Sequence, residues 1–150
     1  MSEMYHYTQC GLDNVYLVNG FHEEKTPYGN SVRFDDPAGL DRFIAEQVAK
    51  GPGRLTGQEI RYIRNYMDMS QVALAKLMGK KDSQPIALWE KGRKIPDTEN
   101  FLLRHIFRQF LGDRKGYIAM VEELNNRERE ENREIRLQER DRKWGCASGC

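Results

Sequence analysis

The sequence predicts a mainly α-helical protein with a small β-hairpin and helix module at its start. Three observations lead to this fold class. Between residues 57 and 111, apolar residues recur at the three- and four-residue spacing of amphipathic helices. Glycine and proline interrupt this pattern, which favours several short helices over one long helix. Residues typical of strands, with turn residues between them, are concentrated in the first 35 positions of the 150-residue chain.

The first 50 residues are predicted to form two strands and a helix. NVYLVNGF at 14–21 and SVRF at 31–34 favour strands, and TPYGN between them is typical of a turn. Asp36 is a candidate N-cap because a proline at the first helical position follows it. The apolar spacing after it predicts a helix of about three turns. GPG at 51–53 cannot continue that helix and indicates a linker.

Helix caps mark two short helices in the next segment. Thr56 and Glu59 match a capping box, in which each side chain satisfies a free amide of the first turn. Asp68 or Ser70 starts a second helix, and Gly79 ends it, because glycine readily adopts the left-handed conformation found after helices.

A third and a fourth helix follow. Asp82 or Ser83 caps the third helix, Pro85 is tolerated in its first turn, and Gly92 ends it. Two short helices joined through a glycine turn are typical of a helix-turn-helix. The fourth helix, within 97–111, is apolar on more than one face, so part of it must pack beyond the three-helix core.

These elements divide the chain into three parts. Residues 1–50 form the hairpin and helix module, and residues 54–112 form the helical domain. Residues 113–150 are predicted to be a charged tail, either helical or disordered. Within this tail, residues 125–143 carry seven basic and six acidic side chains, so their charges almost cancel.

Positive charge is concentrated in the middle of the chain. Residues 1–50 hold four Lys or Arg and eight Asp or Glu, residues 51–96 hold nine and four, and residues 97–150 hold eleven and eleven. A net charge of +5 in the middle segment fits a module that binds a polyanion, although solvated surfaces also carry such charge.

The third helix should present one face to the core and one to a partner. Ile86, Trp89 and Glu90 share the inward face at helical spacing. On the outward face, a glutamine amide can form two hydrogen bonds with adenine, and methyl groups can contact thymine. The residues expected to contact bases are Ser83, Gln84, Ala87 and Leu88. Those expected to contact phosphates are Lys80, Lys81, Lys91, Arg93 and Lys94.

The stretch LTGQEIRYIRNYMDMSQVALAKLMGKKDSQPIALWEKGRKIP, about 42 of 150 residues, resembles the helix-turn-helix domain of the Xre family, the Cro and phage-repressor type. This resemblance implies that Gln71 contacts a phosphate and supports Gln84. It also implies a structural ion pair between Arg64 and Glu90. The motifs that carry it are Ser70-Gln71, the small Ala75, the turn at Gly79, and Trp89-Glu90-Lys91-Gly92.

The N-terminal part is similar to the MqsA and YgiT type of antitoxin regulator, in which a zinc-binding module precedes an Xre domain. This chain lacks the CxxC pairs of that family. His6, Cys10 and His22 could supply at most three ligands, and the sequence indicates no fourth. We therefore expect neither a metal nor another cofactor.

The apolar stripe of the fourth helix is expected to serve both the core and a dimer interface. Phe101, Phe107 and Phe110 are the residues assigned to that interface. A homodimer is expected because helix-turn-helix proteins of this type bind DNA as dimers, at paired half-sites about 34–36 Å apart.

Several classes of protein are not supported by the sequence. It contains no phosphate-binding glycine loop, no HExxH motif and no nucleophile motif with a partner histidine, so we do not expect an enzyme. It contains no segment long and apolar enough for a membrane span and no secretion signal, so a cytoplasmic protein is expected. The three cysteines, Cys10, Cys146 and Cys150, are expected to be reduced thiols.

Together these features predict a transcriptional regulator, a repressor, that binds double-stranded DNA as a homodimer. The alternative is an antitoxin that neutralises a protein toxin and represses its own operon. Its toxin-binding surface would be the acidic N-terminal module or the charged tail. A third hypothesis makes the N-terminal module a sensor of a ligand or metal.

Overall fold

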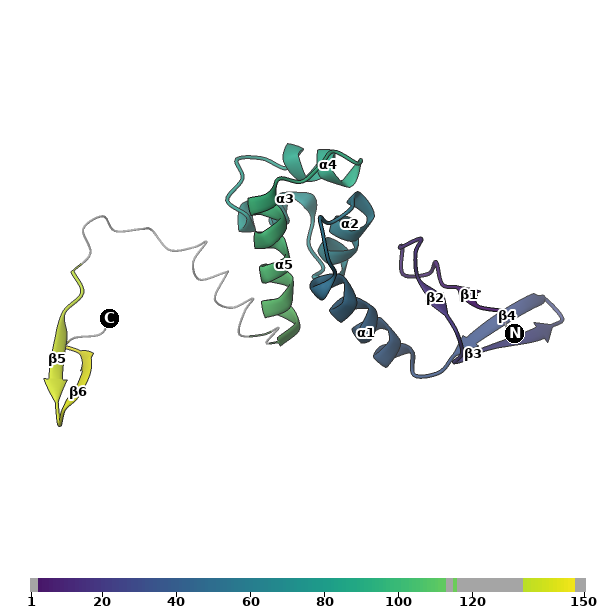
Figure 1. Cartoon of the computed structure of the whole chain (residues 1–150), viewed down its shortest axis with the longest axis horizontal. Helices are drawn as coiled ribbons and strands as arrows, with labels where there is room; N and C mark the ends of the chain where they lie inside the picture. The colour runs from purple at the N-terminus through teal and green to yellow at the C-terminus, as the bar shows by residue number, and fades with distance from the viewer. Residues whose placement is uncertain (1–2, 113–114, 116–133, 148–150) are drawn as a thin grey trace. The chain divides into compact units, whose positions relative to one another are not determined.

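A computed structural model describes residues 3–112, 115 and 134–147. The chain divides into two compact units, Met1–Ala119 and Met120–Cys150. The described residues form five helices and three two-stranded antiparallel sheets, which is a mixture of helix and strand rather than the mainly α-helical protein expected (Figure 1). No helix in the described ranges combines the length and apolar character needed to cross a bilayer.

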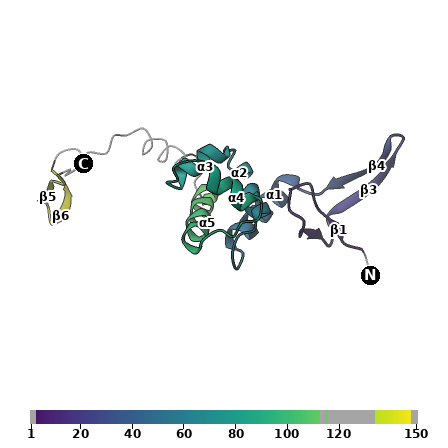
Figure 2. The same ribbon diagram turned by 90° about the horizontal axis from the view of Figure 1, so that it is seen from above.

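The N-terminal part of the first unit contains two strand pairs. β1 (Tyr5–His6) pairs with β2 (Tyr16–Leu17), and β3 (Phe21–Thr26) pairs with β4 (Gly29–Phe34). Both views show β3 and β4 as an antiparallel hairpin (Figure 2). The prediction that NVYLVNGF forms one strand and pairs with SVRF is therefore wrong. The partner of SVRF is the charged strand FHEEKT, and only Tyr16–Leu17 and Phe21 of the predicted strand lie in strands.

Aromatic contacts explain this strand pairing. Phe21 lies opposite Phe34 in the register of β3 and β4. The ring of Tyr5 lies 5.4 Å from that of Phe21 and 5.5 Å from that of Phe34, and Tyr7 meets Phe34 edge-on at 5.0 Å. Edge-on and tilted aromatic pairs at such distances are favourable beyond the area that they bury. The cluster joins both strand pairs into one module.

Helix α1 (Pro37–Lys50) begins as predicted, because the Asp36 side chain accepts a hydrogen bond from the amide of Gly39. Its last carbonyl groups are held by α5 (Asp97–Gly112): Arg104 donates from Nη1 to the oxygens of Val48 and Ala49, at 2.9 and 3.4 Å. The same guanidinium donates from Nη2 to the oxygen of Gly53. GPG at 51–53 therefore ends α1 but does not separate two packed units, since α1 belongs to the first compact unit.

The caps of the next two helices agree with the predicted ones. In α2 (Gly57–Tyr66), Thr56 and Glu59 form the complete capping box. In α3 (Gln71–Leu77), the side chain of Ser70 accepts from the amide of Ala73, so Ser70 and not Asp68 is the cap. Gly79 follows α3 with a positive φ of 74°, the conformation for which glycine was expected there.

Helix α4 (Gln84–Glu90) has Ser83 at its N-cap position, but the Ser83 side chain makes no capping hydrogen bond. Asp82 takes that role, because its Oδ1 accepts from the amide of Gln84 at 2.9 Å. Helix α5 (Asp97–Gly112) begins where expected and packs against α1.

The core of the first unit draws on all five helices, on Tyr7 and Leu12 of the N-terminal module, and on Leu55 and Ile95 in the segments before α2 and α5. Phe107 and Phe110 are 0% and 2% exposed, and both rings contact Tyr66 edge-on. Their assignment to a dimer interface is therefore wrong, because the core of the same chain covers them. Phe101 is 74% exposed and stacks on His105.

The second unit corrects the predicted tail. β5 (Leu137–Arg140) and β6 (Lys143–Cys146) form a hairpin, whereas a helix or disorder was expected there. Residues 113–114 and 116–133, on which the rest of that prediction falls, lie outside the described residues. Cys146 is disulfide-bonded, so the expectation of reduced thiols is wrong for this residue. Cys10 is free, and Cys150 lies outside the described residues.

Candidate nucleic-acid interface

The inward face of α4 fixes this helix against α2 and α3. Ile86 is fully buried, Trp89 is 4% exposed and Glu90 is 8% exposed, as the spacing predicts. The end of α4 also lies against the first residue of α2. A Cβ atom added to Gly57 would lie 2.6 Å from the carbonyl oxygen of Glu90, so no larger residue fits there without movement of a backbone. α4 is thus a short helix held in one orientation.

Glu90 is the polar centre of this packing. Arg64 donates two hydrogen bonds to it, from Nε to Oε2 and from Nη2 to Oε1, both at 2.9 Å. Arg61 donates from Nε to Oε1 at 3.1 Å, and Gln71 donates from Nε2 to Oε2 at 3.3 Å. Planar, bidentate pairs of this kind are the stronger class of charged hydrogen bond. One carboxylate therefore joins α2, α3 and α4.

The surroundings of Glu90 keep it ionised. Burial by itself would raise the pKa of the Glu90 carboxyl group. The hydrogen bonds from Arg64, Arg61 and Gln71, together with the charge of Arg64, outweigh burial and hold the pKa below its usual value. The side chain of Glu90 is 1% exposed, so this negative charge depends on its partners and not on water.

Two of these contacts differ from what the sequence suggested. The sequence reasoning did not assign Arg61, although it lies three residues before Arg64 and so on the same face of α2. Gln71 was expected to contact a phosphate and to support Gln84. Its amide donates to Glu90 instead, which makes Gln71 part of the helix packing.

The outward face of α4 borders an open groove. Gln84 is exposed, and Ser83, Ala87 and Leu88 are partly exposed. The groove has a volume of about 440 Å³. Its residues come from the turn before α4, from α4 itself and from the loop after it: Lys80, Lys81, Asp82, Gln84, Pro85, Leu88, Trp89 and Arg93. A polar amide and an aliphatic side chain thus lie beside one another, with basic side chains around them.

The basic residues assigned to phosphates fall into two groups. Lys81, Lys91, Arg93 and Lys94 are exposed, and none of them forms an ion pair within the described ranges. Lys80 differs, because its Nζ lies 2.6 Å from Oε1 of Glu99 and 5.8 Å from the centroid of the Trp89 ring. In this structure, therefore, a carboxylate of the same chain neutralises the Lys80 charge, unlike the charges of the other four residues.

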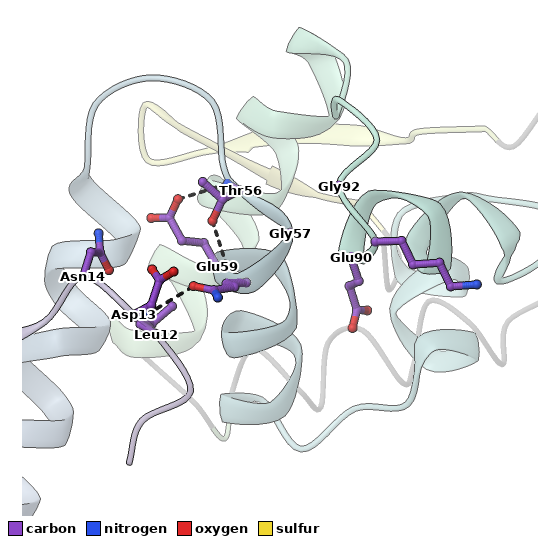
Figure 3. A pocket seen from close by; sticks show the side chains of 10 residues that line it. Leu12, Asp13, Asn14, Thr56, Gly57, Glu59, Glu90 and Gly92 are labelled. Carbon is purple, nitrogen blue, oxygen red and sulfur yellow. Dashed lines mark hydrogen bonds between the residues drawn. The ribbon is translucent and has the colours of Figure 1, made fainter. Parts of the chain in front are cut away.

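A second hollow, of about 360 Å³, lies at the other end of α4 (Figure 3). The loop 12–14, the start of α2 and residues 90–92 line it. Figure 3 shows Asp13 and Glu59 on one side and Glu90 across from them. The amide of Asp13 donates to Oε1 of Gln58 at 3.3 Å, so the N-terminal module contacts α2 beside the end of α4. Lys91 borders this hollow as well.

The three residues considered for a metal lie in separate local contacts. Nε2 of His6 lies 2.7 Å from the carbonyl oxygen of Asp13, and Nε2 of His22 lies 3.0 Å from Oδ1 of Asp35. The Cys10 thiol lies 3.7 Å from the carbonyl oxygen of Tyr7. Within the described ranges, no three His, Cys, Asp or Glu residues are grouped so that they could hold a metal ion.

Comparison with known proteins adds no assignment, because no protein-family model, curated protein or solved structure matches the chain. The site must therefore be interpreted from its own chemistry. An exposed amide beside aliphatic groups can recognise a base edge, and unpaired lysine and arginine side chains around it can bind phosphates.

Proposed function

We propose that this protein is a sequence-specific DNA-binding regulator of the Xre helix-turn-helix type, in which α3 and α4 are the two helices of the motif. One observation carries the proposal. α4 is held rigidly by its buried face, while its other face offers Gln84 beside four exposed basic residues that have no ion-pair partner among the described residues. A fixed helix with a polar face and a basic rim suits the major groove.

The division of labour follows from these residues. Lys81, Lys91, Arg93 and Lys94 bind phosphates and position the protein on the duplex. Gln84 reads a base, with Ser83, Ala87 and Leu88 beside it. The pair of Arg64 and Glu90 reads no base; it holds α4 against α2 and so fixes the orientation of α4. Regulation by repression follows when such a complex covers a promoter.

We further propose that two copies bind paired half-sites. Of the residues assigned to the dimer contact, Phe101 remains on the surface, where it stacks on His105 at 6.4 Å between ring centroids. An exposed phenylalanine of this kind is a common anchor of protein interfaces.

Selection of random duplexes by the purified protein tests the proposal. We expect a palindromic consensus, and we expect Gln84→Ala to weaken binding to it by about 1–3 kcal/mol while binding to a scrambled duplex changes little. Lys91→Ala is the matched control, because a lost phosphate contact weakens binding to both duplexes alike. It also makes the slope of log K against log salt concentration shallower by about one. Equal losses on both duplexes for Gln84→Ala would remove its role in base reading.

The β3–β4 hairpin favours a second function, that of an antitoxin. Tyr28, at the turn of this hairpin, is 98% exposed, and residues 1–50 carry eight acidic against four basic residues. An exposed aromatic residue in an acidic module suits a protein partner. An antitoxin should be encoded beside a toxin gene and should restore growth when that gene is expressed. Rescue that is lost in Tyr28→Ala would support this function, and the absence of any rescue by the wild-type protein would exclude it.

A further inference from the structure

The groove beside α4 contains one basic residue whose charge is already neutralised. Nζ of Lys80 and Oε1 of Glu99 lie 2.6 Å apart, and the two side chains are 27% and 20% exposed. Lys81 and Arg93, which line the same groove, are exposed and form no ion pair with a described residue. The groove is therefore less positive than its sequence indicates.

The pair is more than a chance surface contact. The Lys80 ammonium group also lies 5.8 Å from the centroid of the Trp89 ring, so side chains of both α4 and α5 contact it. The hydrogen bond from Lys80 holds the pKa of Glu99 below its usual value, so Glu99 is ionised at neutral pH. The Glu99 carboxylate therefore accepts from the Lys80 ammonium group, as a phosphate oxygen of DNA would.

We propose that Glu99 withholds Lys80 from DNA, so that Lys80 positions the turn before α4 and makes no phosphate contact. This inference rests on the proposed DNA-binding function and deepens it. Sequence-independent affinity grows with the number of phosphates that basic side chains neutralise, whereas base reading does not depend on that number. Glu99 then sets affinity and not sequence preference: it lowers affinity for every duplex by the same factor and leaves the base reading by Gln84 unchanged.

The magnitude follows from counterion release. Each phosphate contact contributes about −0.9 to the slope of log K against log salt concentration. If the added Lys80 contact contributes nothing in 1 M salt, a slope of about −0.9 makes binding about eight-fold tighter at a ten-fold lower salt concentration, 0.1 M.

The experiment measures affinity for a preferred and a scrambled duplex at four or more salt concentrations. Three variants are compared with the wild-type protein: Glu99→Gln, the double variant Lys80→Gln with Glu99→Gln, and Lys81→Gln. We expect Glu99→Gln to bind both duplexes about eight-fold more tightly in 0.1 M salt and to steepen the slope by about one. The double variant should keep the wild-type slope, and Lys81→Gln should flatten it by about one.

Two results would overturn the inference. Glu99→Gln could leave the slope unchanged, or the double variant could flatten the slope as much as Lys81→Gln does, which would mean that Lys80 contacts a phosphate in the wild-type complex. Circular dichroism of each variant checks that the helices are retained, and the double variant has the net charge of the wild-type protein. The proposed function fails in a different way, namely when the wild-type protein shows no preference between the two duplexes.

Discussion

Replacement of Glu90 by glutamine tests the packing of α4 most directly. The substitution preserves the size of the side chain but removes its charge and turns one oxygen into a donor. Arg61, Arg64 and Gln71 all donate to this carboxylate, so the new amide group faces donors only. The Arg64 side chain, 15% exposed, would then keep a positive charge with no carboxylate beside it.

The expected loss of unfolding free energy is about 3–5 kcal/mol, the usual cost of removing one member of a buried ion pair. Urea unfolding followed by circular dichroism at pH 7 measures it. Glu24→Gln is the matched control, because Glu24 pairs with Arg33 at 3.6 Å while both side chains are more than half exposed. That control should change stability by less than about 1 kcal/mol.

Arg61→Gln separates the two arginines. Its side chain is 59% exposed, so we expect a loss below about 1 kcal/mol although it touches the same oxygen as Arg64. If Glu90→Gln costs no more than Glu24→Gln, then Glu90 does not stabilise the contact between α2, α3 and α4, and our explanation of the orientation of α4 is wrong.

Three further results are expected. The pKa of the Glu90 carboxyl group is lower in the folded than in the unfolded protein. Its contribution to stability is therefore complete above the unfolded pKa of about 4.3 and is lost as the pH falls through the folded pKa. Below pH 5, the free energy of unfolding of Glu90→Gln should depend less on pH than that of the wild-type protein. Gly57→Ala should cost about 1–3 kcal/mol in urea unfolding, because its Cβ would lie 2.6 Å from a backbone oxygen, whereas Gly112→Ala, with no atom within 4 Å, should cost nothing. Phe107 is buried and Phe101 is exposed, so Phe107→Ala should cost about 3–5 kcal/mol of unfolding free energy in the same assay and Phe101→Ala less than about 0.5 kcal/mol. Equal losses for the two variants would contradict this difference in burial.

The features that the sequence predicts best are those that depend on neighbouring residues. The caps at Asp36, Thr56 and Ser70 and the turn at Gly79 are all present, since a cap needs only a side chain and amides three residues away. The inward face of α4 is equally local, because the helical period alone decides it. Sequence reasoning is sufficient where the partner of a residue lies within one helical turn.

The errors concern partners that lie far away in the sequence. Lys80 was assigned to a phosphate because it is basic and precedes α4, but the sequence could not show that Glu99, nineteen residues later, pairs with it. The helical period put Phe107 on an apolar face without showing whether the same chain or a second copy covers that face. The resemblance to the Xre family led to the expectation that Gln71 contacts a phosphate, and it could not show that the Gln71 amide donates to Glu90, nineteen residues later.

The strands were the least predictable elements. FHEEKT contains two glutamates and a lysine, residues that are depleted in strands, yet it forms β3 because Phe21 lies opposite Phe34 and Thr26 pairs with Gly29 at the turn. β5 and β6 likewise carry Arg140, Lys143 and other polar residues that favoured a tail. In short two-stranded pairs, turn geometry and one cross-strand contact outweigh composition.

The burial of Leu12 means that the helices depend on the N-terminal residues for part of their core. Leu12 is 3% exposed and Tyr7 is 8% exposed, and both belong to the apolar cluster that the helices form. Without these two side chains, part of the apolar surface of the helices would be exposed to water. Division of the chain at residues 51–53 would therefore separate side chains that pack in one core.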